Sequence, residues 1–328
     1  MTSKRVPYSP DRDFLRVRDF LADTYALFDA PVNWGIERWN YARYFVAPML
    51  GAYGTEDGRP QGSLDAIALW EDLTAIWEAD GEVVGVATIE HPDLTHPGFG
   101  EIFVQRQPGH IELLDEMLAY GEQRYANPET GASWIFVWED DEPLIDVLQR
   151  RGYVRNEERS SSHLEYAIAD VPEPEFPDGF TVRSMAEGGD IDKRREIFGR
   201  SFNHKDPREW PSRFAYEELM RAPDYHSEND MIVLAPDGTY AACCIVWYDS
   251  ANRVGHLEPL GTRPEYRKRG MARALLLHAV RRLKELGAER MPMTGGFDPF
   301  YEAFGFRKVR TGHVWEKGRP ESQTQEKA

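Results

Sequence analysis

Alternating and helical spacings of apolar residues predict two successive α/β segments along the 328-residue chain. The pattern is clearest in the second half, where strand-like and helical stretches follow one another. There we expect strands at residues 180–185, 231–235, 240–248, 253–262 and 289–294, and helices at 191–202, 213–221, 272–286 and 299–305. Residues 306–315 are predicted to form a closing hairpin.

The first half repeats this order more weakly. We expect helices at residues 13–27, 38–50 and 110–125, strands at 73–79, 82–89, 101–105 and 134–138, and a further helix that ends at Gly152. Asp80-Gly81 is a typical hairpin turn between two of these strands. The repetition indicates a tandem duplication that has diverged.

Two changes in composition divide the chain. Residues 170–179 are rich in proline and acidic residues and lack apolar periodicity, which is typical of a linker. From Glu316 onward Lys, Gln, Glu and Ser dominate, as in a frayed tail. We therefore expect a domain at 1–170, a linker at 171–179, a second domain at 180–317 and a disordered tail at 318–328.

Charge and cysteine content narrow the class of protein. The net charge of −17 disfavours nucleic acid and anionic membranes as partners and favours cationic small molecules, although acidity also serves solubility. The chain lacks an apolar run of the roughly 20 residues that a membrane span needs, and residues 1–13 are too polar for a signal peptide. The adjacent Cys243 and Cys244 fit a reducing compartment, and no spacing suggests a metal site. We expect a cytoplasmic protein; its oligomeric state is not readable.

The loop at residues 267–272 carries the clearest chemistry. A predicted strand runs through it directly into a helix, whose first N–H groups are free to bind an anion. The helix dipole adds about half a positive charge there. Arg267, Lys268 and Arg269 add cations, while Gly270 and Ala272 leave the backbone accessible. The loop is predicted to cradle a diphosphate.

The spacing Arg267-x-x-Gly270-x-Ala272 resembles the acyl-CoA signature of the GNAT N-acetyltransferase superfamily. Arg-Pro-Glu-Tyr precedes it at residues 263–266, and Phe-Tyr-Glu-Ala-Phe-Gly-Phe at 300–306 resembles a downstream family element. A nucleotide P-loop is disfavoured because its Gly-x-x-x-x-Gly-Lys-Ser/Thr pattern is missing. The resemblance implies an α/β fold with two tandem GNAT-type domains, each a mixed, mostly antiparallel, splayed sheet flanked by helices.

The resemblance also implies acetyl-CoA as the acyl donor. Its pyrophosphate would bind the amides of residues 268–272, and its pantetheine arm would pair with the strand before them like an added strand. The implied donor-binding residues are Leu260, Gly261, Thr262, Arg267, Lys268, Arg269, Gly270, Met271, Ala272 and Tyr301. Tyr301 matches the position that often protonates the leaving thiolate; alternatively, it is a packing aromatic residue. Pro259 and Pro292 fit a sheet that splays open.

Acyl transfer to an alkylamine needs a base, because neutralising an amine of pKa about 10.4 at pH 7 costs roughly 4–5 kcal/mol. Strand alternation puts His256, Glu258, Leu260 and Thr262 on one face, unless a bulge at Pro259 breaks the parity. His256 and Glu258 are both candidate bases, with Glu258 slightly favoured. Each is alternatively a hydrogen-bonded residue of the pocket wall.

The corresponding loop of the first half has lost these features. Arg106-x-x-Gly109 survives, but Ile111 stands where Ala272 is, acidic residues follow, and Leu148 takes the place of Tyr301. We expect a degenerate GNAT domain with a structural or substrate-shaping role; weak CoA binding there is the alternative.

Aromatic residues mark two further segments. Residues 32–45 form either a core-packing helix or the wall of a pocket or domain interface. Trp210 and Phe214 are candidates for the acceptor wall. The expected function is direct acetyl transfer from acetyl-CoA to a primary amine of a small molecule, and the acidic charge favours a cationic one. A protein N-terminus or lysine is the alternative acceptor for the same reaction. The alternative is a non-catalytic acyl-CoA sensor or scaffold.

Overall fold

The computed structural model describes residues 3–28, 34–50, 60–92, 99–295 and 299–318. They form two compact units with separate hydrophobic cores. As far as it is described, unit 1 comprises Met1–Asn33, Ala68–Ser162 and Arg310–Ala328, and unit 2 comprises Trp34–Ile67 and His163–Val309. The units differ from the domains predicted at 1–170 and 180–317, because Trp34–Ile67 belongs to unit 2. The predicted tail beyond Gly318 lies outside the described residues.

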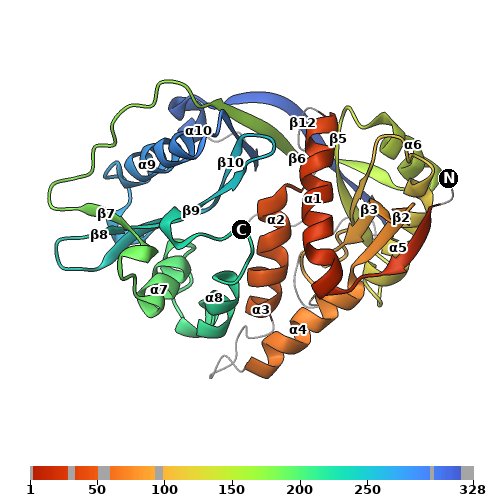
Figure 1. The fold of residues 1–328 in the computed structure, drawn as a ribbon, viewed down its shortest axis with the longest axis horizontal. Coiled ribbons are helices and arrows are strands. Elements are labelled where there is room, and N and C mark those ends of the chain that lie inside the picture. Colours follow the sequence, from red (N-terminus) through yellow and green to blue (C-terminus); the bar gives the residue numbers. More distant parts are fainter. Residues whose placement is uncertain (1–2, 29–33, 51–59, 93–98, 296–298, 319–328) are drawn as a thin grey trace. The chain divides into compact units, whose positions relative to one another are not determined.

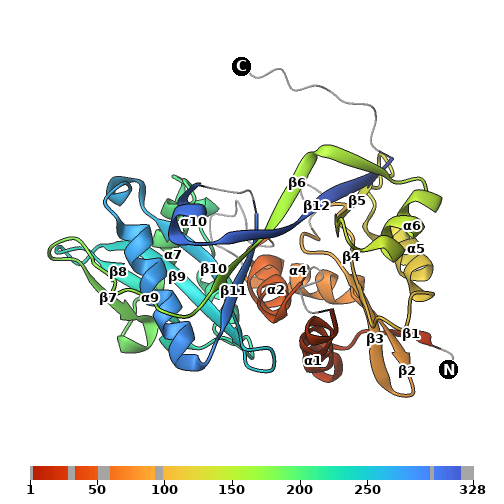
Figure 2. The ribbon, with the colours of Figure 1, turned by 90° about the horizontal axis from the view of Figure 1, so that it is seen from above.

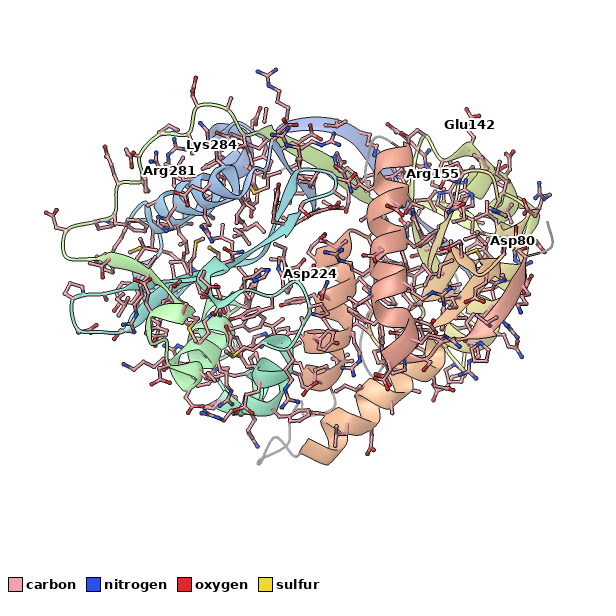
Figure 3. The ribbon with its side chains drawn as sticks, viewed as in Figure 1. Asp80, Glu142, Arg155, Asp224, Arg281 and Lys284 are labelled. Carbon is pink, nitrogen blue, oxygen red and sulfur yellow. The ribbon has the colours of Figure 1, made fainter. Side chains whose placement is uncertain are left out.

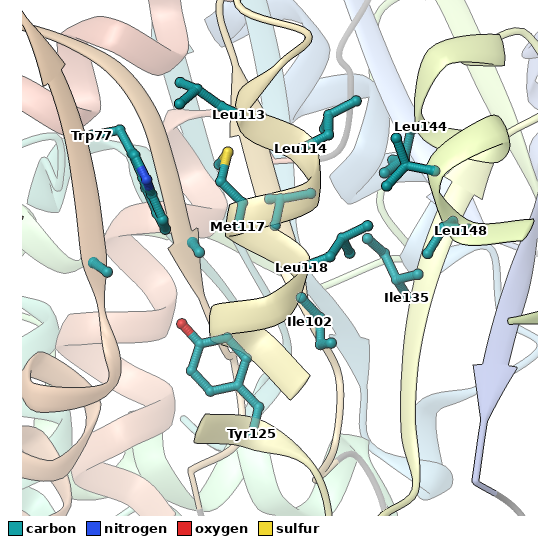
Figure 4. Packing of buried hydrophobic residues seen from close by; sticks show 14 of the residues in the cluster. Trp77, Ile102, Leu113, Leu114, Met117, Leu118, Tyr125, Ile135, Leu144 and Leu148 are labelled. Carbon is teal, nitrogen blue, oxygen red and sulfur yellow. The ribbon is translucent and has the colours of Figure 1, made fainter. Parts of the chain in front are cut away.

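Unit 1 is built around an antiparallel sheet in the order β1-β2-β3-β4. Its elements are β1 (Lys4–Pro7), α1 (Pro10–Phe28), β2 (Ala75–Ala79), β3 (Glu82–Thr88), β4 (Phe103–Arg106), α5 (Leu113–Tyr125), β5 (Ser133–Trp138) and α6 (Glu142–Arg150), with α4 (Pro60–Leu73) leading into it (Figure 1). The predicted turn between β2 and β3 is confirmed, with positive φ at Asp80 and Gly81. Figure 4 shows its core, in which Met117 and Leu118 of α5 face Trp77, Ile135 and Leu148.

Unit 2 is built around a mixed sheet in the order β6-β11-β10-β9-β8-β7. The pairs β7–β8, β8–β9 and β9–β10 are antiparallel, and β11 is parallel to β10. The elements are α2 (Ile36–Tyr41), a π-helical turn (Ala42–Val46), α3 (Ala47–Leu50), β7 (Thr181–Ser184), α7 (Ile191–Ser201), α8 (Arg213–Leu219), β8 (Asp230–Leu234), β9 (Tyr240–Asp249), β10 (Val254–Thr262), α9 (Met271–Leu286), β11 (Arg290–Gly295) and α10 (Pro299–Phe304). These elements confirm the α/β alternation predicted for the second half.

Helices cover both faces of this sheet, with α9 on one face and α7 on the other (Figure 1). Successive side chains of β9 point to opposite faces of the sheet and therefore pack in both cores. Those on the α9 side are Cys244 and Val246, and those on the α7 side are Cys243, Ile245 and Trp247. Both cysteines are free and fully buried, and burial raises the pKa of each thiol. They act as small apolar side chains of the core.

Two long strands contribute residues to both units (Figure 2). β6 (Val154–Ala167) and β12 (Arg307–Lys317) are single strands. The hairpin predicted at residues 306–315 is therefore wrong. Gly312 lies within β12, and a Cβ there would come within 2.4 Å of the Phe136 ring. Gly312 therefore allows β12 to pack closely against β5 and does not form a turn.

The predicted linker lacks helix and strand and is fastened to α9. Arg281 donates a hydrogen bond of 3.2 Å to the carbonyl oxygen of Val171 and forms an ion pair of 2.7 Å with Glu173. Lys284 donates to the carbonyl oxygen of Ala169. Figure 3 labels both basic residues on α9. Across the described helices, none has the length and apolar character required to cross a membrane.

Candidate active site

The loop before α9 adopts a backbone suited to an anion. Lys268 and Gly270 both have positive φ, 61° and 79°, on either side of Arg269. Alternating φ signs turn successive N–H groups toward one side of the chain. The first turn of α9 adds donors, because its hydrogen bonds begin with the Ala274 amide and the Gly270 carbonyl, at 3.0 Å. Residues 267–270 are exposed, so these amides are accessible.

The three cations of this loop have different surroundings. Arg267 donates from Nε to the carbonyl oxygen of Thr262 at 3.0 Å and from Nη2 to that of Ser201 at 2.7 Å. Its guanidinium therefore braces the loop against the ends of β10 and α7. Arg269 lies 5.8 Å from the centre of the Tyr266 ring, and Lys268 is exposed. Lys268 and Arg269 supply positive charge to solvent at the entrance to the helix.

Strand β10 carries a bulge at the predicted position. Leu257 is opposite Val246 and Leu260 is opposite Cys244, so three steps along β10 match two along β9. The extra residue lies beside Pro259, and the indole N–H of Trp247 donates to the carbonyl oxygen of Glu258 at 3.1 Å.

The bulge changes which residues share a face. His256 and Glu258 both contact α2 on the α7 side, whereas Leu260 packs into the α9-side core. Uninterrupted alternation would have placed Leu260 with the two candidate bases. That expectation is wrong, and the predicted break in parity at Pro259 is the reason.

Two residues of α2 complete this group, and neither lies in a motif or spacing that indicates such a role. Arg38 Nη1 lies 2.7 Å from Glu258 Oε1, and Glu37 Oε1 lies 3.3 Å from His256 Nδ1. α2 is about two hundred residues away along the chain, so only the fold brings these charges together. The aromatic segment that contains α2 is predicted from sequence to belong to the first half. In the structure Phe45 packs in the α7-side core of unit 2, which confirms the core-packing interpretation.

Burial sets the protonation of the Glu37–His256 pair. Burial raises the pKa of Glu37 to about 8, and the carboxylates of Glu258 and Asp249 add to this. Burial also lowers the pKa of His256 to about 4, against the influence of the same two carboxylates. Both shifts favour the uncharged forms at neutral pH. Among the residues the structure describes, no group of three or more His, Cys, Asp or Glu side chains is arranged to hold a metal ion.

Tyr301 belongs to a different cluster. Its half-buried ring, on α10, packs against Phe300 and Phe306 at 5.0 and 5.5 Å and joins the α9-side core. The structure thus brings His256 and Glu258 together and puts Tyr301 with the residues around α9. Its role as proton donor stays a prediction.

The sheet opens between β10 and β11. In the described register the two strands pair only at Val254 and Arg290. Farther along, residues Leu260–Thr262 of β10 still pair with β9. Pro259 and Pro292 lie where the two strands diverge. A proline is tolerated there because no backbone N–H is needed for a hydrogen bond between these strands. The backbone edge of β10 therefore faces the opening beside the α9 loop.

Trp210 and Phe214 are both half-buried in unit 2. The indole of Trp210 rests on α7, where a Cβ on Gly199 would lie 1.9 Å from it, and its N–H donates to the carbonyl oxygen of His204 at 3.1 Å. Their predicted role in an acceptor wall stays a prediction.

The equivalent loop of unit 1 is acidic. Arg106, in the place of Arg267, is 5% exposed and pairs with Asp141 at 3.2 Å. The hollow beside α5 and α6 is lined by Ile111, Glu112, Asp115, Glu142, Pro143, Asp146, Val147 and Arg150. Four carboxylates and one guanidinium repel a diphosphate. Figure 3 labels Glu142, one of these carboxylates. Leu148, which stands in the place of Tyr301, is fully buried.

A mixed sheet that opens beside a helix start suited to an anion is the geometry that the resemblance to the acyl-CoA signature implies. Residues 192–306 match the acetyltransferase (GNAT) family model, so this part of the chain is a GNAT acyltransferase domain. A mycothiol acetyltransferase of Amycolatopsis mediterranei is 26% identical over 281 residues, which cover 75% of this chain and 84% of the relative.

Solved structures share the fold. A tandem GNAT protein from the clavulanic acid biosynthesis pathway superposes with a TM-score of 0.57 at 14% identity, covering 98% of this chain and all of that one. A GCN5-related N-acetyltransferase from Sphaerobacter thermophilus gives 0.55 at 18% identity, covering 85% and 93%. The predicted fold of two tandem GNAT domains is therefore confirmed.

Proposed function

We propose that the chain is an N-acetyltransferase that moves the acetyl group of acetyl-CoA to a primary amine of a small, cationic molecule. We assign the reaction to the second half and a structural or substrate-shaping role to the first. One observation carries the proposal: the exposed amides before α9 adjoin the open edge of β10, and the same strand presents His256 and Glu258.

The donor fits the α9 loop. The amides and cations of the loop suit a diphosphate, and the open edge of β10 suits the amide groups of a pantetheine arm. Acetyl-CoA supplies an acetyl group activated as a thioester. The residues that we assign to donor binding lie at the end of β10, in the α9 loop and on α10, and are Leu260, Gly261, Thr262, Arg267, Lys268, Arg269, Gly270, Met271, Ala272 and Tyr301.

Direct transfer is favoured over a covalent acyl-enzyme. A cysteine nucleophile must form a thiolate and reach the substrate. Cys243 and Cys244 are fully buried, and burial raises their pKa values. The amine therefore attacks the thioester itself, after His256 or Glu258 has taken its proton. Tyr301 then donates a proton to the departing thiolate.

The acceptor is inferred from charge. Glu258 and Asp249 act on His256 as nearby negative charges, and the chain has a net charge of −17. Carboxylates near the candidate base favour a cationic amine. Two curated relatives are named mycothiol acetyltransferases, which supports a small-molecule acceptor over a protein.

The test is release of free CoA thiol from acetyl-CoA across a panel of small amines, with products weighed by mass spectrometry. We expect turnover with at least one cationic primary amine. If the protein binds acetyl-CoA but acetylates no amine, lysine peptide or protein N-terminus, the sensor or scaffold alternative replaces the proposal.

Tyr301→Phe tests the proton donor. Removing the hydroxyl is expected to lower kcat by about 100-fold, a typical contribution of general acid catalysis, while the acetyl-CoA Kd changes less than about twofold. Phe300→Tyr, on the same helix, serves as the matched control for ring packing. Unaltered turnover in Tyr301→Phe would remove this residue from the mechanism.

A further inference from the structure

We propose that Glu37 is a positioning residue of the active site, whose carboxylate holds His256 Nδ1 and takes over the proton that His256 Nε2 accepts from the amine. The inference rests on the proposed function and deepens it. It makes a residue of the first half necessary for chemistry assigned to the second half.

α2 is held in a fixed place on unit 2. The Asn40 side chain donates to Asp224 Oδ2 at 2.7 Å and to the carbonyl oxygen of Ile36 at 2.8 Å. Trp39, between them on the same helix, is fully buried. Figure 3 labels Asp224 beside this helix. Glu37 therefore approaches β10 from an anchored helix and not from a loose loop.

The surroundings of Glu37 are built for its carboxylate. Oε1 lies 3.3 Å from His256 Nδ1, and Oε2 is buried without a hydrogen-bond partner among the described residues. A Cβ on Gly35 would lie 2.3 Å from Oε2, so an alanine at residue 35 would push the carboxylate away from its present position. The neighbouring Arg38 is directed to Glu258 at 2.7 Å. Glu258 thus has a guanidinium partner, whereas Glu37 has an imidazole.

The proton step balances without another reactant. The ammonium form of the acceptor gives one proton to His256 Nε2, and His256 gives its Nδ1 proton to Glu37. The amine becomes neutral, His256 stays neutral in its other tautomer, and Glu37 becomes a neutral acid. Two opposite charges disappear together, which a buried site favours. A carboxylate that orients a histidine base acts similarly in hydrolytic triads.

The charges that face Glu37 define a pH dependence. They are Arg38 on its own helix, Asp249 on β9, and His256 and Glu258 on β10. With its pKa raised to about 8, Glu37 is the carboxylate that gains its charge in the working pH range. Only above about pH 8 is Glu37 ionised and therefore able to take the proton from His256.

The decisive measurement is the pH profile of kcat/KM for an accepted amine. The wild type is expected to show an ascending limb near pH 8. Glu37→Gln is expected to lose that limb and about 100-fold of the rate at pH 8, with the KM for acetyl-CoA unchanged. Glu37→Asp should restore part of the rate and the limb. Glu217→Gln, an exposed carboxylate on α8, is the charge-matched control and should match wild type.

Gly35→Ala probes the position of the carboxylate. Gly35 has φ −88° and ψ −178°, an extended backbone that alanine adopts without strain, so only the added methyl acts. We expect the same loss of the ascending limb. A Glu37→Gln profile that keeps the limb and is only scaled down would overturn the proposal, as would wild-type rates.

A second readout does not depend on turnover. The folded protein raises the pKa of Glu37 from about 4.5 to about 8, so it binds more protons than the unfolded chain in that window and loses stability as pH rises. The lowered pKa of His256 acts oppositely, but only below about 6.5. Between pH 6.5 and 8 the urea midpoint should fall more in wild type than in Glu37→Gln. If the urea midpoint falls equally with pH in wild type and Glu37→Gln, the Glu37 proposal is overturned even where acetylation is found. If the midpoint falls more steeply in wild type but no amine is acetylated, only the proposed function is overturned.

Discussion

At the scale of single residues, Gly270 sets the shape of the α9 loop. Its φ of 79° lies in the left-handed region, which costs other residues about 1–2 kcal/mol. A Cβ there meets nothing within 4 Å, so a substituted side chain would act through backbone strain and charge and not through a clash.

Gly270→Glu is therefore expected to weaken acetyl-CoA binding at least tenfold, about 1.4 kcal/mol, measured by calorimetry. Gly270→Ala separates strain from repulsion and should have the smaller effect. Gly109→Glu makes the same change in the loop of unit 1, where a Cβ also has open space. It should leave the affinity within twofold. The opposite ranking would place the donor in unit 1.

The site was readable from sequence to the extent that it is local. The loop at 267–272 and the bulge at Pro259 follow from neighbouring residues, because glycine, proline and helix-start chemistry act over a few positions. Glu37 and Arg38 were missed since their role depends on contacts with His256 and Glu258. No spacing rule connects residues so far apart along the chain.

At the scale of elements, a buried ion pair ties α7 to β8. Arg194 Nε lies 2.8 Å from Asp230 Oδ1, and both side chains are fully buried. The hydroxyls of Tyr216 and Tyr225 donate to the other oxygen of Asp230. Removing one member of such a pair leaves an uncompensated charge.

Asp230→Ala is expected to lower the free energy of unfolding by about 3–5 kcal/mol, measured by urea denaturation. Arg213→Ala breaks the exposed pair with Glu217 on α8 and should cost less than about 1 kcal/mol. If both variants lose a similar amount of unfolding free energy, the buried pair does not stabilise the fold more than the exposed pair does.

Most elements were predicted within a few residues, because each repeats its own apolar period. The exception at the C-terminal end is informative. The sequence pattern of β12 predicts a hairpin, whereas in the structure Gly312 permits close packing of one strand against Phe136. From sequence alone, a glycine that allows close packing between strands cannot be distinguished from a glycine in a turn.

At the scale of the whole molecule, the core of unit 2 includes a segment of the first half. Phe45 is 1% exposed and its ring lies 5.2 Å from Phe198 of α7 and 4.8 Å from Tyr41. Sequence periodicity identified the helix, but not the unit whose core it completes.

Phe45→Ala is expected to cost about 3–5 kcal/mol and to lower hydrogen-exchange protection in α7 and α8 before the strands of unit 1. Leu118→Ala, fully buried in the core of unit 1, should show the reverse order. Loss of protection in unit 1 alone for Phe45→Ala would contradict the assignment of this segment.

The membership of Trp34–Ile67 in unit 2 has an evolutionary consequence. A deletion or recombination at the linker would remove aromatic residues from the core of unit 2, together with Glu37 and Arg38. Purifying selection would then act on the first half through the residues that it contributes to this core, and a split of the gene at the linker would be selected against.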